Sequence, residues 1–510
     1  MKKFAVLIFF ALLSGGLTRA SDIYLAQNSA GAGDGSSCGN AKAVSFFNSS
    51  SNWGTGSSQI GPGDTVHLCG TISAAAGSTA LTFQGSGTSG SPITLLFEAG
   101  AGLTAPYWSA ANGGININGR SYLTIDGGSN GYINTSQNGS SLANKSDTKS
   151  LFVGGCTGCV IKNLTISNMF VHTSGTSGGN SYGIYLYGGN NNTVTDNTIH
   201  DGRWCVFYIY PGGSTTSNNV VSDNTIYNCD HAITAGDGNS SATLTNFTIS
   251  GNTIHDMVNW DESTDSFHHD YVHVWAVGGS STITGLQIFN NYFYGDPGQN
   301  NTALVNIETQ SGNTNDGALV YNNVLTNSSS SHLSPYGYIS SGGTNISLYN
   351  NTIVGSSTSQ SIANECFYLG GKNYKIFNNT CQNVGLFLYL GTNGSVSQVD
   401  RNNWYNGGGF YAKGSFLSLA AWKLMCLCDA NSITSNPNLD GSFKPPSSSP
   451  LLKVASNLAS LGVSNLNKDK ALQARPSSSA GNWDIGAYAY GSSSSATAPN
   501  APTGLTASVQ

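Results

Sequence analysis

Short segments that mix apolar and polar residues in alternation run through most of the chain. Residues 183–188 alternate two aliphatic side chains with two tyrosines, and residues 192–199 place Val194 and Ile199 among threonines and asparagines. Such alternation is typical of strands of four to six residues, in which half of the side chains face inward. Gly, Asn and Ser lie between these segments and predict turns. The pattern therefore predicts strands throughout, with few helices.

The strands recur with a period. A short phrase ending in Asn and a β-forming residue occurs nine times, about every 28 residues. The anchoring asparagines are Asn168, Asn197, Asn224, Asn252, Asn291, Asn323, Asn351, Asn379 and Asn403. One interval is about eleven residues longer than the others, and it holds residues 260–275. A fixed period of this length predicts a solenoid, and an insertion into a solenoid predicts a loop on its binding face.

A repeat of this length, rich in Asn, Gly, Val and Ile, predicts an all-β fold: a right-handed parallel β-helix with a C-terminal capping segment. Residues 110–411 resemble the pectate-lyase-like superfamily of secreted β-helix proteins. That resemblance implies a polysaccharide partner. It does not define the reaction, because the same fold hosts lyases, hydrolases, tailspikes and adhesins.

The remaining segments differ in composition. Residues 1–20 combine two lysines, an apolar run and Ala20, which predicts a secretory signal peptide. Residues 21–120 are predicted to be entry coils and 121–411 the repeats. Residues 412–490 are predicted to cap the open end, and 491–510 to be a linker with a truncated fibronectin-like tail.

Composition narrows the class of protein. Only 9% of the residues are charged, the net charge is −6, and no basic stripe occurs, which argues against nucleic acid as a partner. No segment is long and apolar enough for a membrane span, and we expect a secreted monomer. Ten cysteines in an exported chain indicate disulfides. The expected pairs are Cys38/Cys69, Cys156/Cys159, Cys205/Cys229, Cys366/Cys381 and Cys426/Cys428.

Alignment of the strands that end in Gly predicts a core and an outward row. Ile184 and Phe207 share one inward column with Ile233, and the alternate residues then face solvent. Exposed aromatic side chains suit the apolar faces of sugar rings, so the outward row predicts a glycan groove. The alternative to a groove is that loops of neighbouring coils cover these aromatic side chains, which then form a secondary core. The predicted substrate-binding residues are Tyr185, Tyr187, Tyr208, Tyr210, Trp275, Asn306 and Glu308.

The long interval holds four carboxylates and three imidazoles within residues 260–275. A histidine oriented by a carboxylate is suited to taking a proton, so His269 or His273 is the expected base, with Asp270 beside it. Lyases of the resembled fold commonly use Lys or Arg and neutralise a uronate carboxylate with a cation. Here Arg203 is the expected neutralising group, and Tyr271 or Tyr208 the proton donor.

Three further carboxylates of the interval are predicted to hold Ca²⁺ through oxygen ligands: Asp261, Glu262 and Asp265. The histidines and carboxylates can also form a transition-metal site. We expect a polysaccharide-cleaving enzyme and favour β-elimination. The alternatives are a glycoside hydrolase with paired carboxylates among Asp237, Asp270 and Glu308, and a non-catalytic glycan-binding or adhesive protein.

Overall fold

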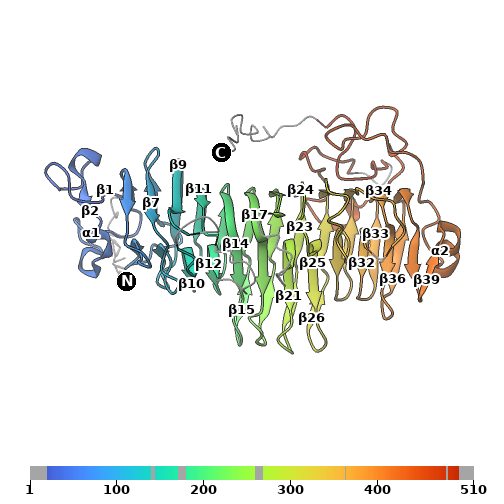
Figure 1. The fold of residues 1–510 in the computed structure, drawn as a ribbon. Helices are drawn as coiled ribbons and strands as arrows, with labels where there is room; N and C mark the ends of the chain where they lie inside the picture. Colours follow the sequence, from blue (N-terminus) through green and yellow to red (C-terminus); the bar gives the residue numbers. More distant parts are fainter. Residues whose placement is uncertain are drawn as a thin grey trace, which may run out of the picture.

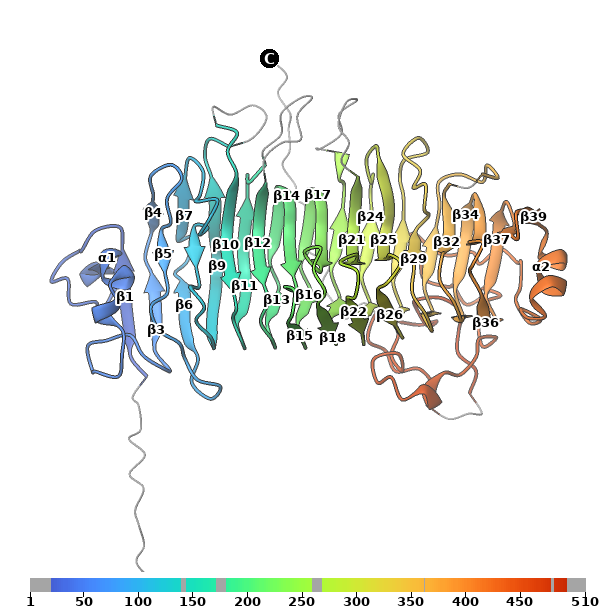
Figure 2. The same cartoon turned by 90° about the horizontal axis from the view of Figure 1, so that it is seen from below.

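The computed structural model describes residues 20–138, 144–170, 180–258, 268–361, 363–477 and 481–492. Within them the chain winds into one elongated right-handed parallel β-helix, with its coils stacked side by side (Figures 1 and 2). The predicted fold class is confirmed. The predicted signal peptide, apart from residue 20, and residues 493–510 lie outside the described residues. No helix among those described is long and apolar enough to span a membrane.

Each coil contributes strands to three parallel sheets. We call the first the site sheet. Its strands are β5 (Leu81–Thr82), β8 (Ile115–Asn116), β10 (Thr148–Gly154), β12 (Ser181–Tyr187), the second halves of β14 (Thr198–Ile209) and β17 (Thr225–Gly236), β21 (His269–Ala276), β25 (Asn301–Thr309), β29 (Ile339–Ser341), β32 (Glu365–Leu369), β35 (Leu386–Leu390) and β38 (Phe410–Ala412).

The second sheet follows the site sheet along the chain. Its strands are β1 (Asp22–Ala26), β3 (Thr65–Leu68), β6 (Ile93–Phe97), the first parts of β9 (Leu123–Thr135) and β11 (Val160–Ser167), β13 (Thr193–Thr195), β16 (Val220–Ser222), β19 (Thr248–Ser250), β23 (Gln287–Phe289), β27 (Leu319–Tyr321), β30 (Ser347–Tyr349), β33 (Tyr374–Phe377) and β36 (Val396–Asp400).

The third sheet closes the coil. Its strands are β4 (Thr71–Ser73), β7 (Gly102–Ala105), the second parts of β9 and β11, the first parts of β14 and β17, β20 (Thr253–His255), β24 (Tyr292–Tyr294), β28 (Val324–Thr326), β31 (Thr352–Val354), β34 (Thr380–Val384) and β37 (Asn403–Gly407). A small separate sheet, made from loops between the site sheet and the second sheet, contains β15 (Thr215–Ser217), β18 (Thr243–Thr245), β22 (Thr282–Thr284) and β26 (Thr314–Asp316).

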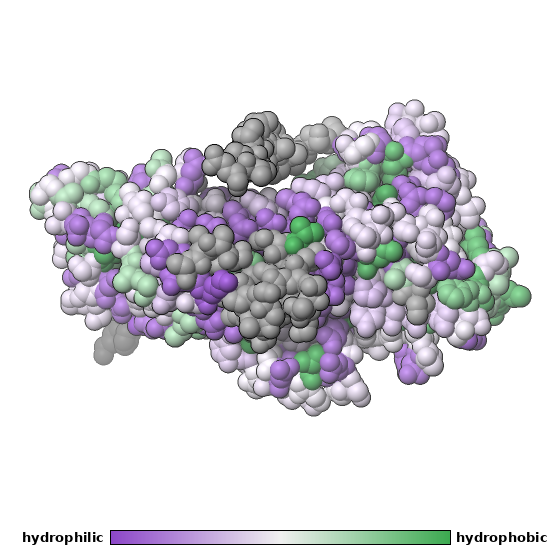
Figure 3. All heavy atoms as spheres, in the orientation of Figure 1, coloured by the Kyte–Doolittle hydropathy of each residue, from purple (hydrophilic) through white to green (hydrophobic). Residues whose placement is uncertain are grey.

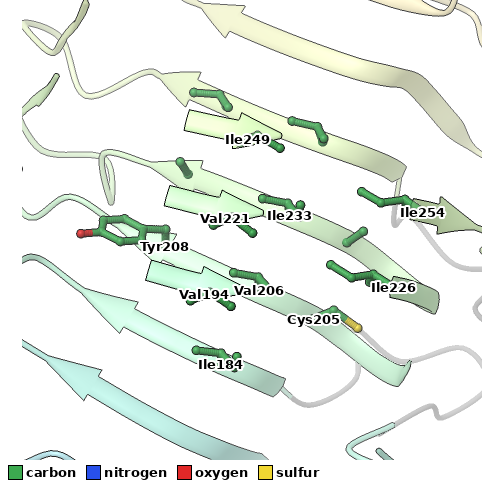
Figure 4. Close-up of a cluster of buried hydrophobic side chains, with 14 of the residues drawn as sticks. Ile184, Val194, Cys205, Val206, Tyr208, Val221, Ile226, Ile233, Ile249 and Ile254 are labelled. Atoms are coloured by element: carbon green, nitrogen blue, oxygen red, sulfur yellow. The ribbon is translucent and has the colours of Figure 1, made fainter. Parts of the chain in front are cut away.

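Aliphatic side chains fill the interior in columns, one residue per coil. Figure 4 shows Ile184, Val206 and Ile233 in one column and Val221 beneath Ile249 in another. All are at most 1% exposed. Neighbouring strands lie about 4.8 Å apart, so like residues stack with little empty space. On the face shown in Figure 3, the atoms drawn in colour are mostly polar or neutral, with small separate hydrophobic patches.

The anchoring asparagines form a continuous buried ladder along one corner. Asn252, for example, donates from its backbone N and its Nδ2 to Oδ1 of Asn291, at 2.9 and 3.0 Å, and from Nδ2 to the carbonyl of Val221. The members are Asn197, Asn224, Asn252, Asn291, Asn323, Asn351, Asn379 and Asn402. Asn402, rather than the predicted Asn403, is the last member, and Asn168 is not one of them.

The residue before each ladder asparagine turns the chain through the left-handed region, with φ between +52° and +70°. Asp, Asn and Gly adopt this region most readily, which explains why they occupy the position. These residues are Asp196, Asp223, Gly251, Asn290, Asn322, Asn350, Asn378 and Arg401. The repeated sequence phrase therefore encodes a left-handed turn followed by a buried amide.

In the later coils this turn residue has a second role. Asn322 donates to the carbonyl of Lys468, Asn350 to those of Asp484 and Gly486, and Asn378 to that of Ser456. The C-terminal segment thereby lies along the side of the helix near β24 to β34 (Figure 1). Its apolar residues, such as Leu451 and Trp483, pack on a row of aromatic side chains from the second sheet: Phe289, Tyr321 and Tyr349.

Only a short part of the C-terminal segment covers the open end. After β39 (Ser415–Leu417), helix α2 (Leu419–Cys426) buries Trp422, whose ring stacks on Phe410 at 5.0 Å. Ser418 caps the helix by accepting from the backbone N of Ala421. At the opposite end lie α1 (Ser45–Asn48) and β2 (Lys42–Ala43). Within the predicted cap of residues 412–490, α2 thus lies at the open end, whereas Ser456, Lys468, Asp484 and Gly486 are bonded to asparagines on the side of the helix.

The ten cysteines form five disulfides, and the predicted pairs are confirmed. Complete pairing of this kind is typical of proteins that fold in an oxidising compartment.

Replacement of Asn252 by Ala should lower the free energy of unfolding by about 1–3 kcal/mol, because the backbone N and Nδ2 of Asn224 lose their buried acceptor and Oδ1 of Asn291 loses one of its donors. The measurement is denaturant unfolding of the purified protein. Asn112→Ala, at an exposed position, is the matched control. Equal midpoints for both variants would contradict a stabilising ladder.

Candidate functional site

The strands of the site sheet begin at a corner where two successive residues face inward. Cys205 and Val206 are both buried in the core, as are Ala232 and Ile233, and Tyr271 and Val272. Alternation therefore restarts at each corner. The residue before each inward pair and the residue after it both face outward. The pairing of strands in neighbouring coils then places the outward residues in three rows.

The three rows run across several coils. The first row contains Lys149, Tyr182, Trp204, His231 and Asp270; the second contains Phe152, Tyr185, Phe207, Thr234, His273 and Asn306; the third contains Tyr187, Ile209, Gly236, Trp275 and Glu308. Tyr185, Tyr187, Trp275, Asn306 and Glu308 are thus outward. Their role in sugar binding stays a prediction.

The predicted outward position of Tyr208 and Tyr210 is wrong. Both are at most 1% exposed, and Figure 4 shows Tyr208 among the core side chains. Tyr208 donates to the carbonyls of Gly188 and Gly189, and Tyr210 to that of Trp275. Val206, not Phe207, pairs with Ile184. The expected alignment was shifted by one residue in this coil, which exchanges the two faces of the strand.

Half-buried aromatic rings form a platform at the N-terminal side of the outward rows. We define it as Phe152, Tyr182, Tyr185, Trp204 and Phe207. The ring centroids of Tyr185 lie 5.5 Å from Phe152 and 5.2 Å from Phe207, and those of Trp204 and Phe207 lie 4.8 Å apart. Lys149 Nζ lies 5.0 Å from the ring centre of Tyr185, and burial lowers the pKa of this lysine.

Trp275 extends this platform from the other side. Its indole lies over Gly236 in the preceding coil, where a Cβ would fall 1.8 Å from Cε2 of the tryptophan. The indole lies 6.3 Å from Phe207 and 4.8 Å from the ring of His273. Gly236 therefore allows a tryptophan to lie flat between the platform and the histidines.

Beside the platform, three imidazoles surround one carboxylate oxygen. Oδ2 of Asp270 lies 2.9 Å from Nδ1 of His268, 3.5 Å from Nδ1 of His273 and 3.5 Å from Nε2 of His231. We call these four residues the His–Asp cluster. Oδ1 of Asp270 accepts from the hydroxyl of Thr302 and, at 3.1 Å, from the backbone N of Ala303. Asp270 is fully buried, whereas the side chain of His268 is 44% exposed.

A second carboxylate supports the cluster from behind. Asp230 is fully buried; its Oδ1 lies 2.9 Å from Nδ1 of His269, and its Oδ2 lies 3.2 Å from Nδ1 of His231 and 3.4 Å from Nε of Arg203. Trp204 stacks on His231 at 4.4 Å. On the solvent side, Nε2 of His273 lies 3.2 Å from Oε2 of Glu308.

These contacts shift the pKa values in opposite directions. Although burial raises the pKa of the Asp230 and Asp270 carboxyls, the adjacent imidazoles outweigh it and hold both well below the usual range. The His273 hydrogen bond lowers the pKa of Glu308. Burial opposes charge on His231, yet its two carboxylate neighbours raise its pKa; burial lowers that of His273. All three carboxyls are therefore ionised at neutral pH.

Several predicted catalytic residues lie elsewhere. His269 is 1% exposed and holds Asp230, so it cannot contact a substrate. Tyr271 occupies the inward corner position and donates to the carbonyl of Tyr294, which excludes it as a proton donor on this face. Arg203 and His273 do lie at the cluster. Because His269 and His273 are buried, replacing them would also destabilise the fold.

Sequence reasoning missed Lys149, Phe152, Tyr182 and Phe207. They lie two to four coils before the long interval, and only the strand register brings them to the same face. Nothing in their local sequence marks them, apart from the general excess of aromatic residues in outward positions.

The predicted calcium ligands Asp261, Glu262 and Asp265 lie outside the described residues. Among the described residues, the His–Asp cluster is the group of metal-binding side chains that converges. Three nitrogen donors and one oxygen do not fit Ca²⁺, which takes six to eight oxygen ligands. The donor set fits a transition metal instead.

Two further carboxylates lie apart from the His–Asp cluster: Asp237, which is among the predicted hydrolase residues, and Glu365, which is not. Asp237 is fully buried and accepts from the backbone N of Asn239, Val277 and Gly278, so it has a structural role. Glu365 occupies the row of Asp270 three coils further on, or about 14 Å away at the usual strand spacing.

Comparisons with known proteins agree with this fold. Residues 107–285 match the model of the "Right handed beta helix region" family. The right-handed β-helix predicted from the sequence is confirmed. No curated protein sequence matches the chain.

Solved structures with similar folds include pectate lyase Pel9A (15% identity, 93% of this chain and 97% of that chain, TM-score 0.39). A second is a mannuronic acid specific family 6 lyase from human gut microbiota (13% identity, 83% of this chain and 89% of that chain, TM-score 0.43). A third is the GH136 lacto-N-biosidase from Eubacterium ramulus (11% identity, 77% of this chain and 67% of that chain, TM-score 0.43). None of these likenesses identifies the reaction of this chain.

Gly236→Ala should displace Trp275 from its position over β17, because the new Cβ overlaps the indole. The expected result is a changed tryptophan fluorescence spectrum and at least a tenfold loss of affinity for any glycan that the protein binds. Gly90→Ala is the matched control, since no atom lies within 4 Å of the point that its new Cβ would occupy and its backbone is outside the left-handed region. Unchanged fluorescence and affinity in Gly236→Ala would show that the indole does not depend on this glycine.

Glu365 gives a prediction on pH. It is fully buried, neither carboxyl oxygen has a hydrogen-bond partner, and burial raises its pKa from 4.5 to about 8. Between these values the unfolded chain releases the proton and the folded chain keeps it, so stability falls as the pH rises. Glu365→Gln removes this loss. Its gain in Tm over the parent should grow from pH 5 to pH 8, reaching roughly a few degrees.

Thermal unfolding at several pH values tests this, with Asp147→Asn as the control for loss of a carboxylate at an exposed site. A Tm difference for Glu365→Gln that stays constant with pH would show that Glu365 has the same protonation state in the folded and unfolded chain.

Proposed function

We propose that the protein is a secreted enzyme that binds a polysaccharide across the site sheet and cleaves it at the His–Asp cluster. One observation carries the proposal: the aromatic platform and Trp275 lead directly to the cluster on a single face. The five disulfides support secretion.

The platform suits a sugar chain in two ways. Its rings are half-buried rather than covered, and Tyr187 beside them is 45% exposed. Aromatic faces left in contact with water are favourable sites for the C–H faces of sugars. Because the rings come from successive coils, a long ligand can lie along the helix axis and contact several of them.

The cluster is better suited to β-elimination than to hydrolysis. Elimination requires a base that takes the proton next to a uronate carboxyl, and an imidazole is neutral and basic near pH 7. His268 is the cluster imidazole with the most exposed side chain, and Asp270 orients it. Arg203, close to Asp230, is the nearby cation that can face a uronate carboxylate. We therefore assign uronate-containing polysaccharides as the substrate class.

Hydrolysis by two carboxyl groups is less well supported. It requires one protonated carboxyl and a partner about 5–9.5 Å away. Asp270 and Glu308 both face imidazoles that keep them ionised. Glu365 has a raised pKa, but it lies about 14 Å from Asp270 along the stack. A non-catalytic glycan-binding protein would use the same platform without the cluster.

His268→Ala should abolish cleavage, with at least a hundredfold loss of kcat/KM, while the Tm changes little, because the side chain is 44% exposed. The measurement is the ultraviolet absorbance of unsaturated products during digestion of a panel of plant, algal and microbial polysaccharides. His255→Ala is the matched control, since His255 pairs with Asp256 on the third sheet and lies outside the cluster.

The products separate the alternatives. Cleavage without unsaturated ends would indicate a hydrolase, and binding without any product would indicate a glycan-binding protein. Full activity of His268→Ala on a substrate that the parent degrades would place the base elsewhere.

A further inference from the structure

The four side chains of the His–Asp cluster present one donor atom each to a common point. One ligand atom of each residue lies within 4.8 Å of those of the other three. The nitrogens that face Oδ2 of Asp270 are Nε2 of His231, Nδ1 of His268 and Nδ1 of His273. Three of the residues are buried, and the fourth, His268, closes the group from the solvent side.

We propose that these four atoms bind one transition-metal cation, with Zn²⁺ as the best match. Zinc takes four ligands in a tetrahedron with bonds of about 2.0–2.2 Å to N and O, which places neighbouring donor atoms about 3.3 Å apart. The three distances from Oδ2 of Asp270, at 2.9, 3.5 and 3.5 Å, bracket that value. Three neutral imidazoles and one carboxylate form a donor set that binds zinc better than calcium.

The ring nitrogens that face away from this point strengthen the inference. Nδ1 of His231 lies 3.2 Å from Asp230, and Nε2 of His273 lies 3.2 Å from Glu308. Histidines that bind a metal usually donate their other N–H to a carboxylate, which selects the tautomer and orients the ring. The hydrogen bond to Glu308 thus holds His273 with a lone pair directed at the common point, and the ion-pair contact with Asp230 favours the same orientation of His231.

Without a cation the arrangement is costly. His231 is 2% exposed, and both of its ring nitrogens lie close to carboxylates without forming a hydrogen bond of acceptable geometry. Oδ2 of Asp270 would have to satisfy three rings by itself. A bound cation gives each inward-facing nitrogen a partner and compensates the buried negative charge of Asp270 and Asp230.

The inference is independent of the reaction class, although it concerns the site of the proposed function. With a cation bound, the three imidazoles and Asp270 would fill its four ligand positions, and His268 would hold the cation and not accept a proton. Without one, His268 is the base. Metal binding is therefore measured in the absence of substrate, and product formation is measured separately.

The test uses the full mature chain, stripped with a chelator, dialysed and then incubated with Zn²⁺, Ca²⁺ or Mg²⁺. We expect about one zinc per chain by elemental analysis after further dialysis, and a raised Tm with Zn²⁺ but not with Ca²⁺ or Mg²⁺. Co²⁺ in place of zinc should give the intense visible bands of a tetrahedral site. His255→Ala, which alters an imidazole outside the cluster, should bind zinc as the parent does.

Two variants keep the test independent of folding. His268→Ala removes an exposed ligand and should weaken zinc affinity at least tenfold. Glu308→Gln changes only a group behind His273 and should weaken it by about 10–100-fold. No retained zinc and no zinc-dependent rise in Tm in the parent would overturn the proposal, as would zinc affinity that both variants leave unchanged.

Discussion

Exact repetition of one backbone turn is the constraint on which the structure depends. Parallel strands continue their hydrogen bonds from coil to coil only if every coil returns to the same register. A residue in the left-handed region followed by a buried asparagine provides this return at one corner, from Asn197 to Asn402. Because each amide bonds to the next, an error in one coil would leave partners unsatisfied in its neighbours.

The same register brings residues that are far apart in sequence to one face of the helix. Lys149, Trp204, His231 and Asp270 are far apart in sequence, yet they share one outward row because the parallel register of the site sheet places each opposite its counterpart in the next coil. The corner with two inward residues decides which side chains of each strand join this row. The corner with two inward residues therefore determines both which side chains pack in the core and which side chains form the outward site.

Two buried aspartates organise the polar part of the face. Asp270 gathers three imidazoles, and Asp230 holds His269, His231 and Arg203. Ionised carboxylates in a dry environment need partners, and the surrounding rings meet that need while keeping fixed orientations. The same charge that positions the imidazoles for proton transfer also makes their common point attractive to a cation.

The sequence by itself determined the fold, because a 28-residue period with Asn-containing turns leaves few other ways to bury the aliphatic columns. It also indicated the polar residues of the long interval and all five disulfides. Tertiary structure decided which residues face outward: the inward pair Cys205–Val206 moved Phe207 out and Tyr208 in. Strand alternation has period two, so one extra inward residue reverses every later assignment in that strand, and only the register of the neighbouring coils reveals it.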